Sequence, residues 1–254
     1  MCGIAGVYGE CAAFKSLMLT LGQLERGVEG CGIAYICNNG IRIVKDPIHP
    51  VEFTAKRINE ILVDTSSAIS HNRLPSVGKV SYENTHPFMS CNKSFAFAHN
   101  GHAFVTYLRN WLLDIGHKIH GETDSEVLAH TLEQYLEDHG DMLRAVKELV
   151  ENNLSGTIVV LMRSGEIYAA RSGFNTLYYA ISNGEVYIAS SDQAIKYLVG
   201  GRVKVISIED GEIVRVKDGE VEKHRVKSRG WRNIYRIFND YGALSYVSVD
   251  DFLY

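Results

Sequence analysis

The N-terminus of the chain reads Met1-Cys2-Gly3-Ile4-Ala5-Gly6-Val7-Tyr8, and its apolar run predicts a short buried strand from Ile4 to Tyr8. The second residue is a cysteine followed by glycine, and a small second residue is the usual condition for removal of Met1. Removal would give Cys2 a free α-amine. Because an α-amino group titrates at about 7.7–8.0 and a thiol at about 8.5, one residue would supply both a base and a nucleophile. A cysteine at position 2 is by itself more often without function, so the motifs that follow it decide its role.

Four further motifs follow Cys2 in a particular order. They are Arg26-Gly27-Val28-Glu29-Gly30-Cys31-Gly32, His71-Asn72-Arg73, His99-Asn100-Gly101 and Glu122-Thr123-Asp124-Ser125-Glu126. Together with the opening Cys2-Gly3-Ile4, they resemble the class II glutamine amidotransferases, and within that family most of all the glutaminase domain of glutamine phosphoribosylpyrophosphate amidotransferases. The resemblance covers residues 2–200. It implies an α+β fold, namely the four-layer αββα sandwich of the N-terminal-nucleophile hydrolases.

The resemblance also implies which residues perform the chemistry. Cys2 would attack the side-chain amide of glutamine, and the Asn100 side-chain amide and the Gly101 backbone N–H would form the oxyanion hole. Gly27 would allow the backbone to pass close to the Cys2 sulfur, since glycine is the residue for close approach. Without the other motifs, Asn100-Gly101 would be interpreted as a turn that ends a strand.

A second set of residues would bind the substrate. Arg73 would hold the α-carboxylate of glutamine in a bidentate pair, Asp124 would hold its α-ammonium group, and Ser76 belongs to the same pocket. Arg26 would brace the loop near Cys2, and His86 has a supporting place without a catalytic task.

Simpler explanations exist for the two charged residues. An arginine after a strand is more often part of a surface ion pair, so Arg73 alone would indicate little. An acid in the first turn of a capped helix is favoured by the helix dipole, and Asp124 could serve that purpose as well as bind substrate.

The chain departs from the family at Leu74-Pro75-Ser76-Val77-Gly78, where many relatives carry an aromatic residue followed by Ser or Thr. Two alternatives to a glutaminase therefore stay open. One is an amidase of the same fold that acts on another γ-glutamyl or amide substrate, and the other is a non-catalytic module that senses glutamine. The presence of Cys2 beside Arg73 and Asp124 favours the glutaminase, because a sensor needs the two ion-pairing residues but not the nucleophile.

The composition excludes several other classes of protein. The 254 residues carry a formal charge of −4 with acids and bases mixed along the chain, so we expect no nucleic-acid partner. No stretch approaches the ~20 apolar residues of a bilayer crossing, and we expect a cytoplasmic protein without a membrane partner. We expect no cofactor and no metal, because the five cysteines include no CxxC pair and the pairs His99 with His102 and His117 with His120 are interpreted as loop histidines.

The consumer of the ammonia is expected in a separate chain. The sequence contains neither a Ser-Gly-Gly-x-Asp-Ser pyrophosphate loop nor an acidic pair opening a phosphate loop, the marks of the family's synthase domains. We expect glutamine as substrate and an ammonia-accepting synthase subunit as partner, and a homo-oligomer stays open. Residues 1–227 are predicted to form the amidotransferase domain. Residues 228–254 form an extension whose aromatic and arginine content suits packing on the same domain or on a partner.

Periodicity and turn signals predict the order of the elements. Helical spacing marks 12–24, 51–62, 104–115, 124–138, 141–150 and 191–198, with capping boxes at Thr123 with Glu126 and at Ser190 with Gln193. Short apolar runs predict further strands, at 32–37, 41–45, 95–98, 156–163, 166–171, 176–181 and 185–190. Gly-Glu pairs at 165, 184, 211 and 219 are interpreted as hairpin turns. This order predicts largely antiparallel sheets.

Overall fold

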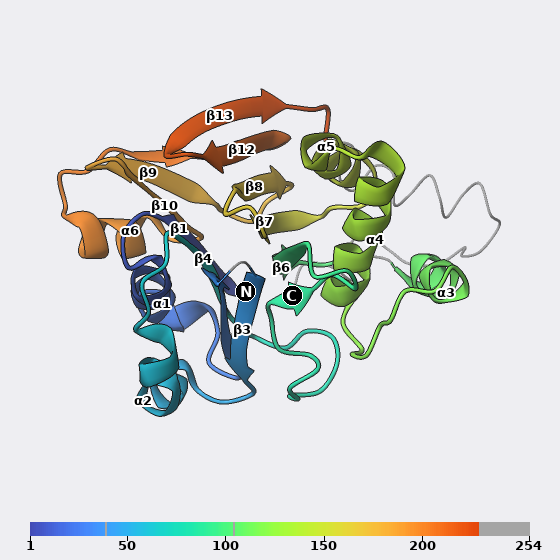
Figure 1. Cartoon of the computed structure of the whole chain (residues 1–254), viewed down its shortest axis with the longest axis horizontal. Helices are drawn as coiled ribbons and strands as arrows, with labels where there is room; N and C mark the ends of the chain where they lie inside the picture. Colours follow the sequence, from blue (N-terminus) through green and yellow to red (C-terminus); the bar gives the residue numbers. More distant parts are fainter. Residues whose placement is uncertain (39, 104, 229–254) are drawn as a thin grey trace.

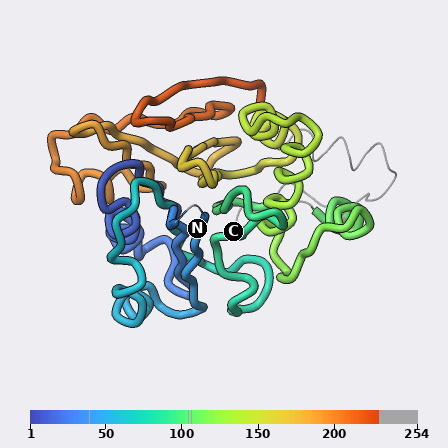
Figure 2. Tube along the Cα trace, viewed as in Figure 1, coloured from blue at the N-terminus to red at the C-terminus, as the bar shows by residue number. Residues whose placement is uncertain are grey.

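The computed structural model describes residues 1–38, 40–103 and 105–228, and it contains two antiparallel β-sheets that lie face to face between two layers of helices (Figure 1). The predicted four-layer αββα sandwich is therefore confirmed. The chain trace in Figure 2 shows the N-terminal part of the chain, in blue and cyan, gathered on one side of the molecule and the helical segment in yellow-green on the other.

Seven strands form the first sheet, in the spatial order β11-β9-β10-β1-β4-β2-β3. Their bounds are β1 (Gly3–Tyr8), β2 (Cys31–Cys37), β3 (Gly40–Asp46), β4 (Ser67–Asn72), β9 (Tyr178–Ser182), β10 (Glu185–Ala189) and β11 (Val205–Ser207). The central strand β1 pairs with β4 in a register that places Gly3 opposite Asn72. Because the strands are antiparallel, Cys2, just before Gly3, comes beside Arg73, just after Asn72.

Six strands form the second sheet, in the order β13-β12-β8-β7-β6-β5. Their bounds are β5 (Phe88–Met89), β6 (Phe95–Gly101), β7 (Gly156–Met162), β8 (Ile167–Ser172), β12 (Glu212–Lys217) and β13 (Glu220–Arg225). β6 continues three residues beyond its predicted end at 98, and Asn100 pairs with Thr157 of β7. The segment 99–101 thus belongs to the ladder, which fixes its backbone more firmly than a turn would.

Helices cover the outer face of each sheet (Figure 1). On the first sheet lie α1 (Ala12–Leu21), α2 (Pro50–Ile61) and α6 (Asp192–Val199), and on the second lie α4 (Asp124–His139) and α5 (Met142–Asn152). A short 3₁₀ helix, η1 (Leu24–Arg26), follows α1, and α3 (Thr106–Asp114) packs beside α4. The predicted helix 12–24 is therefore split, because α1 ends at Leu21 before the 3₁₀ turn begins.

The alternation of side chains along the strands builds three cores. In β6, Phe95 and Phe97 pack beneath α4 and α5, whereas Ala96 and Ala98 point between the two sheets. Ile4 of β1 lies in the same central layer. All five side chains are fully buried, and full burial of a large apolar side chain contributes roughly 1.5–3 kcal/mol to stability.

The helix caps agree only in part with the predictions. The cap of α6 is Ser191, whose Oγ accepts from Ala194 N, so the prediction of Ser190 was wrong by one residue. Ser190 Oγ instead accepts from Ile4 N at 3.1 Å and ties the end of β10 to β1. The Ser190 hydroxyl, which the sequence pattern assigned to the helix cap, therefore bonds across the sheet instead.

At α4 the predicted cap is present, because Thr123 Oγ1 accepts from Glu126 N at 3.3 Å. The Glu126 carboxylate does not complete the box. It accepts from His120 N and Gly121 N, and so holds the loop that leads into the helix.

Three of the four Gly-Glu turns join paired strands. Gly165, Gly184 and Gly219 adopt positive φ in the connections β7–β8, β9–β10 and β12–β13. Gly211 also has a positive φ, of 75°, but it precedes β12 on the crossover from β11 in the other sheet. The hairpin prediction was therefore wrong at that position.

The predicted boundary at 227 and 228 stays a prediction, since the extension from residue 229 onward lies outside the described residues. Within the described part of the chain, no helix combines the length and apolarity needed to cross a membrane.

Candidate active site

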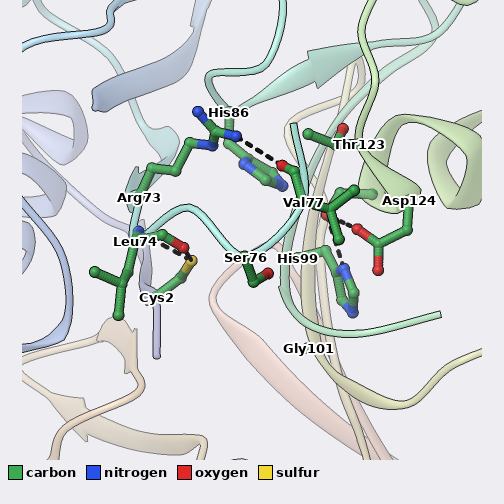
Figure 3. A pocket seen from close by; sticks show the side chains of 11 residues that line it. Cys2, Arg73, Leu74, Ser76, Val77, His86, His99, Gly101, Thr123 and Asp124 are labelled. Carbon is green, nitrogen blue, oxygen red and sulfur yellow. Dashed lines mark hydrogen bonds between the residues drawn. The ribbon is translucent and has the colours of Figure 1, made fainter. Parts of the chain in front are cut away.

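A hollow at the ends of β1, β4 and β6 brings together the segments singled out from the sequence (Figure 3). It is lined by Cys2, Arg73, Leu74, Ser76, Val77, His86, His99, Gly101, Thr123, Asp124 and Ser125. In Figure 3 the Cys2 sulfur lies at the Leu74 side of the hollow, and the Asp124 carboxylate lies at the opposite side.

Cys2 is held mainly through its main chain. Its N–H donates to Asn100 Oδ1 at 3.1 Å, and Arg26 Nε donates to its carbonyl oxygen at 3.0 Å. The backbone N–H of Leu74 donates to the Cys2 sulfur at 3.3 Å. Met1 is 67% exposed, so the residue whose removal would free the α-amine is accessible.

The Cys2 thiol needs a base. Burial raises the pKa of this thiol, although the Leu74 N–H, the positive N-terminus, Arg73 and Arg26 act in the opposite direction. The thiol is therefore protonated at neutral pH, and attack on an amide requires transfer of its proton. A free α-amine on the same residue would be within reach of the sulfur by covalent geometry alone.

The two polar atoms of the Asn100 side chain differ in their hydrogen bonding. Oδ1 accepts from Cys2 N, which fixes the orientation of the amide, and the residue is only 2% exposed. Nδ2 is buried and has no hydrogen-bond partner within the described part of the chain. Leaving a buried donor unpaired costs about 1–3 kcal/mol, so an unpaired Nδ2 beside Cys2 calls for an explanation. An oxygen of a molecule bound at the Cys2 sulfur would satisfy this donor.

Gly101 lines the hollow at the end of β6. A Cβ at this position would lie 2.0 Å from Ser155 O and 2.7 Å from His99 Nε2, so only glycine fits. The glycine is therefore required by the close passage of the Ser155 backbone at this edge of the hollow.

Gly27 permits a close approach, and the atoms nearest to it belong to the peptide that contacts the Cys2 sulfur. The nearest atoms to a Cβ placed there are Arg73 C at 2.6 Å, Arg73 O at 2.8 Å and Leu74 N at 2.8 Å. Gly27 thus makes room for the Arg73-Leu74 peptide, whose N–H contacts the Cys2 sulfur. Arg26, next to it, bonds to Cys2 itself rather than only bracing the loop.

Arg73 is 2% exposed and points along the loop that follows it. Its NH1 donates to Lys79 O at 2.8 Å, and its NH2 donates to Val77 O at 2.9 Å and Gly78 O at 3.1 Å. Backbone carbonyl oxygens therefore accept hydrogen bonds from some of the guanidinium N–H groups. A carboxylate bound here would use the remaining N–H groups or replace some of these carbonyls.

Asp124 is the first residue of α4 and is 7% exposed. Its Oδ2 accepts from Ala103 N at 2.6 Å, and its Oδ1 accepts from Ser125 Oγ at 3.4 Å. Its place in the first turn satisfies the helix dipole, and it also lines the hollow. The two interpretations of this residue are thus compatible.

Two buried histidines, His86 and His99, line the hollow, and a third, His71, contacts both. Burial lowers the pKa of His71 to about 3 and holds the pKa of His86 and of His99 below their usual range. His71 stacks on His86 with ring centroids 3.9 Å apart, and His71 Nε2 contacts His99 O at 3.1 Å. These rings are neutral at pH 7, so they shape the hollow without adding charge.

His86 and Ser76 both line the hollow. Neither ring nitrogen of His86 has a hydrogen-bond partner among the described residues. Ser76 is exposed and lies between Cys2 and the Asp124 side in Figure 3.

Sequence reasoning missed the backbone groups of the site. Leu74 N, Ala103 N and the carbonyls of Val77–Lys79 contact Cys2, Asp124 and Arg73 respectively. Because every residue carries the same backbone groups, the residue types at these positions gave no signal for them.

Three comparisons with known proteins agree with this architecture. A model of the class II glutamine amidotransferases matches residues 3–200. The chain is 33% identical over 227 residues to glutamine–fructose-6-phosphate aminotransferase (isomerizing) of Caldanaerobacter subterraneus, which covers 87% of this chain and 36% of that protein. It is 32% identical over 262 residues to amidophosphoribosyltransferase of Methanocaldococcus jannaschii, with 98% of this chain and 52% of that protein covered.

Among solved structures, glutamine phosphoribosylpyrophosphate amidotransferase of B. subtilis, complexed with ADP and GMP, has the same fold. The TM-score is 0.76 at 24% identity, and the match covers 88% of this chain and 49% of that chain. The chain therefore spans between about a third and a half of the length of these relatives.

Proposed function

The chain belongs to the class II glutamine amidotransferases, and we propose that it is a glutaminase that releases ammonia from the side-chain amide of glutamine through a thioester on Cys2. The observation that carries this proposal is the Asn100 amide. Its Oδ1 holds Cys2 N while its buried Nδ2 lacks a partner, so a spare donor stands beside the nucleophile.

In the proposed reaction the α-amine of Cys2, freed by loss of Met1, takes the thiol proton. The sulfur adds to the amide carbon, and the negative charge that develops on the amide oxygen is stabilised by Asn100 Nδ2 and the Gly101 N–H. The C–N bond then breaks, and the proton held by the α-amine goes to the departing ammonia. Water, deprotonated by the same amine, hydrolyses the thioester to glutamate and restores the thiol.

The substrate would lie across the hollow, with its side-chain amide at Cys2. Arg73 is proposed to bind the α-carboxylate and Asp124 the α-ammonium group. Both residues are nearly buried, and a charge-assisted hydrogen bond is stronger than a neutral one, so this pair can select an amino acid over a simple amide. Ser76 lines the space between and is proposed to contact the substrate.

Covalent labelling tests the nucleophile. 6-Diazo-5-oxonorleucine, an electrophilic analogue of glutamine, is expected to modify Cys2 stoichiometrically and to leave Cys11, Cys31, Cys37 and Cys91 unlabelled. Cys2→Ala should abolish glutamine hydrolysis while the protein stays folded, and Cys11→Ala, the matched control at an exposed thiol, should keep it. Turnover retained in Cys2→Ala would place the nucleophile elsewhere.

The proposed base requires processing of the N-terminus. Intact-mass analysis of an active preparation should show a chain that begins at Cys2. A fully active preparation that retains Met1 would refute the α-amine as the base.

An amidase with a different substrate is the second candidate, and the contacts of Arg73 favour keeping it. Three backbone carbonyls already occupy part of its guanidinium, in the segment where the chain departs from the family pattern. Ammonia release from glutamine, compared with amine release from a panel of γ-glutamyl amides, separates the two. Faster turnover of any other amide than of glutamine would favour this second candidate.

We further propose that the ammonia is used by a synthase carried on a separate chain, in the cytoplasm. All five cysteines are free thiols, which suits a reducing compartment. Co-purification from the native cell should recover a synthase with this chain. Purification of this sequence as part of a longer chain that itself bears a synthase domain would contradict the proposal.

A further inference from the structure

Apart from the hollow, four side chains that can bind a metal ion meet at one point. They are Cys91, His117, His130 and Glu133, and their ligand atoms all lie within 4.8 Å of one another. Cys91 lies in the turn between β5 and β6, and His117 lies in the loop between α3 and α4. His130 and Glu133 are three residues apart on α4, so they share one face of that helix. None of the four lines the hollow.

Four of the six separations among these atoms agree with those around one tetrahedral metal ion. Cys91 Sγ lies 3.8 Å from His117 Nδ1 and 3.6 Å from His130 Nδ1. Glu133 Oε2 lies 3.3 Å from His117 Nδ1 and 3.0 Å from His130 Nδ1. A tetrahedral zinc ion, with bonds of about 2.3 Å to sulfur and about 2.0–2.2 Å to nitrogen and oxygen, separates S from N by about 3.6 Å and N from O by about 3.4 Å. The four distances lie within about 0.4 Å of these values.

Gln134 fixes the orientation of the His117 ring. Gln134 Nε2 donates to Asp138 Oδ1 at 2.8 Å, so its Oε1 is the atom that faces His117 Nε2 at 3.2 Å. His117 Nε2 must then carry a proton, and Nδ1 is the ring nitrogen that faces Glu133. Nδ1 lies 3.3 Å from Glu133 Oε2, so the ring nitrogen and the carboxylate are placed to bind the same metal ion.

Neighbouring groups orient the ligands in the way that metal sites require. The Glu133 side chain is fully buried, and it accepts from Cys91 N at 2.9 Å and from Asn92 N at 3.0 Å. Lys118 N donates to Cys91 Sγ at 3.4 Å, a contact that stabilises a thiolate. Gln134 accepts from the ring nitrogen of His117 that faces away from the cluster, the usual second contact of a ligating histidine.

We propose that Cys91, His117, His130 and Glu133 bind one zinc ion. Four protein ligands close the coordination shell, so the site is structural rather than catalytic. The ion would join three segments that no strand pairing connects: the β5–β6 turn, the α3–α4 loop and α4. That loop leads directly into Thr123 and Asp124, so the metal would stabilise the segment that begins α4. The sequence did not predict this site, because it paired His117 with His120, which is exposed and lies outside the cluster.

Metal content and cobalt substitution test the site directly on the full chain. Elemental analysis of protein purified without chelator should find about one zinc per chain. After removal of zinc with a chelator, added Co²⁺ should give intense visible bands typical of tetrahedral coordination and a near-ultraviolet band from a thiolate ligand. Cobalt bound with only the weak bands of octahedral coordination, or no cobalt bound, would overturn the proposal.

Matched variants identify the ligands. Cys91→Ser and His130→Ala should each weaken Zn²⁺ binding by more than 100-fold and remove the thiolate band or the tetrahedral spectrum. The controls Cys11→Ser and His120→Ala change an exposed thiol and a loop histidine outside the cluster, and they should bind zinc as the wild type does. Unchanged binding in both ligand variants would refute the assignment.

Two further measurements separate a metal site from a plain hydrogen-bond network. At free Zn²⁺ 100 times its Kd, Tm should rise by roughly 5–10 °C in the wild type and not in Cys91→Ser. Gln134→Leu, which removes the contact to His117 Nε2 together with an exposed hydrogen bond to Asp138, should weaken zinc binding by about 10- to 100-fold. If neither zinc nor chelator changes the Tm of the wild type, the four side chains form a hydrogen-bond network without a metal ion, and the proposal is wrong.

Discussion

Replacement of Asn100 by alanine tests the two ends of its side chain at once. The change removes the unpaired Nδ2 donor and the Oδ1 acceptor that holds Cys2 N at 3.1 Å. In the proposed reaction, Nδ2 stabilises charge that exists only after the sulfur has added to the amide. Its loss should therefore appear in kcat, with a smaller effect on KM.

The expected size follows from these contacts. Loss of one oxyanion-hole donor lowers kcat by about 100- to 1000-fold, or roughly 2.7–4 kcal/mol. Loss of the Oδ1 bond to Cys2 N adds at most the net value of a hydrogen bond, about 0.5–1.5 kcal/mol. Because Nδ2 has no hydrogen-bond partner among the described residues, its removal breaks no hydrogen bond within the protein, so Asn100→Ala should lose little stability through that atom.

Asn100→Asp separates the two ends. It keeps an acceptor for Cys2 N but replaces the donor with an oxygen that can carry negative charge. We expect kcat to fall at least as far as in Asn100→Ala, because a carboxylate opposes the oxyanion instead of stabilising it. Steady-state rates of ammonia release from glutamine, with kcat and KM fitted separately, measure both variants.

Thr157→Val is the matched control. Thr157 lies opposite Asn100 in the β6–β7 pair, and its buried Oγ1 has no partner in the described part of the chain, so the substitution changes the same region without removing a bond. Its kcat should stay close to that of the wild type. If Asn100→Ala raised KM and left kcat intact, the assignment of the oxyanion hole to Asn100 would be wrong.

Three further predictions follow from the site. Arg73→Ala and Asp124→Ala should raise KM by about 10- to 150-fold, the value of one charge-assisted hydrogen bond, and should change kcat less; a loss confined to kcat would contradict a role in binding. Gly27→Ala places a Cβ 2.6 Å from Arg73 C, so it should destabilise the fold by about 1–3 kcal/mol and slow the labelling of Cys2 by 6-diazo-5-oxonorleucine. Labelling at the wild-type rate would refute the close approach. Burial lowers the folded-state pKa of His71 from 6.5 to about 3, so between these pH values the unfolded chain binds a proton that the folded protein does not, and stability falls as the pH drops from 6.5 towards 3. From pH 7 to pH 5 the free energy of unfolding, measured with urea, should fall by about 2 kcal/mol, and a flat profile would contradict this expectation.

The sequence predicted the residues of the hollow better than their contacts. Side chains with a distinctive chemistry, such as Cys2, Arg73 and Asp124, stood out in motifs, and all three line the hollow. The sheet register could not be derived from the motifs, although it is what brings Cys2 and Arg73 together through the pairing of Gly3 with Asn72. Register depends on contacts between strands that are distant in sequence, and a local pattern does not contain them.

Local rules failed where a distant partner competed for the same group. Ser190 fitted a helix cap, but its hydroxyl bonds to Ile4 N across the sheet, and Ser191 caps the helix instead. Gly27 fitted a close approach, and only the fold shows that the approaching chain is the Arg73-Leu74 peptide. In both cases the residue type indicated the kind of contact but not the partner.

The metal-binding cluster shows the same limit more strongly. Sequence spacing paired His117 with His120, because neighbours in the chain were the only neighbours available. The fold pairs His117 with Glu133, 16 positions later on α4, and with Cys91 from the turn before β6. A zinc site assembled from three segments has no spacing signature, so absence of a CxxC pair was not evidence against it.

The energetics of Asn100 distinguish an enzyme from a module that only senses glutamine. A sensor needs groups that grip the ends of the ligand in its ground state, and Arg73 and Asp124 would suffice for that. An unpaired Nδ2 buried beside Cys2 gains nothing from such binding unless an oxygen reaches it, and it costs about 1–3 kcal/mol out of a typical total stability of about 5–15 kcal/mol. A cost of that size is explained when the same donor lowers the barrier to addition at the amide by a comparable or larger amount. The arrangement of Asn100 therefore supports the proposed turnover rather than binding alone.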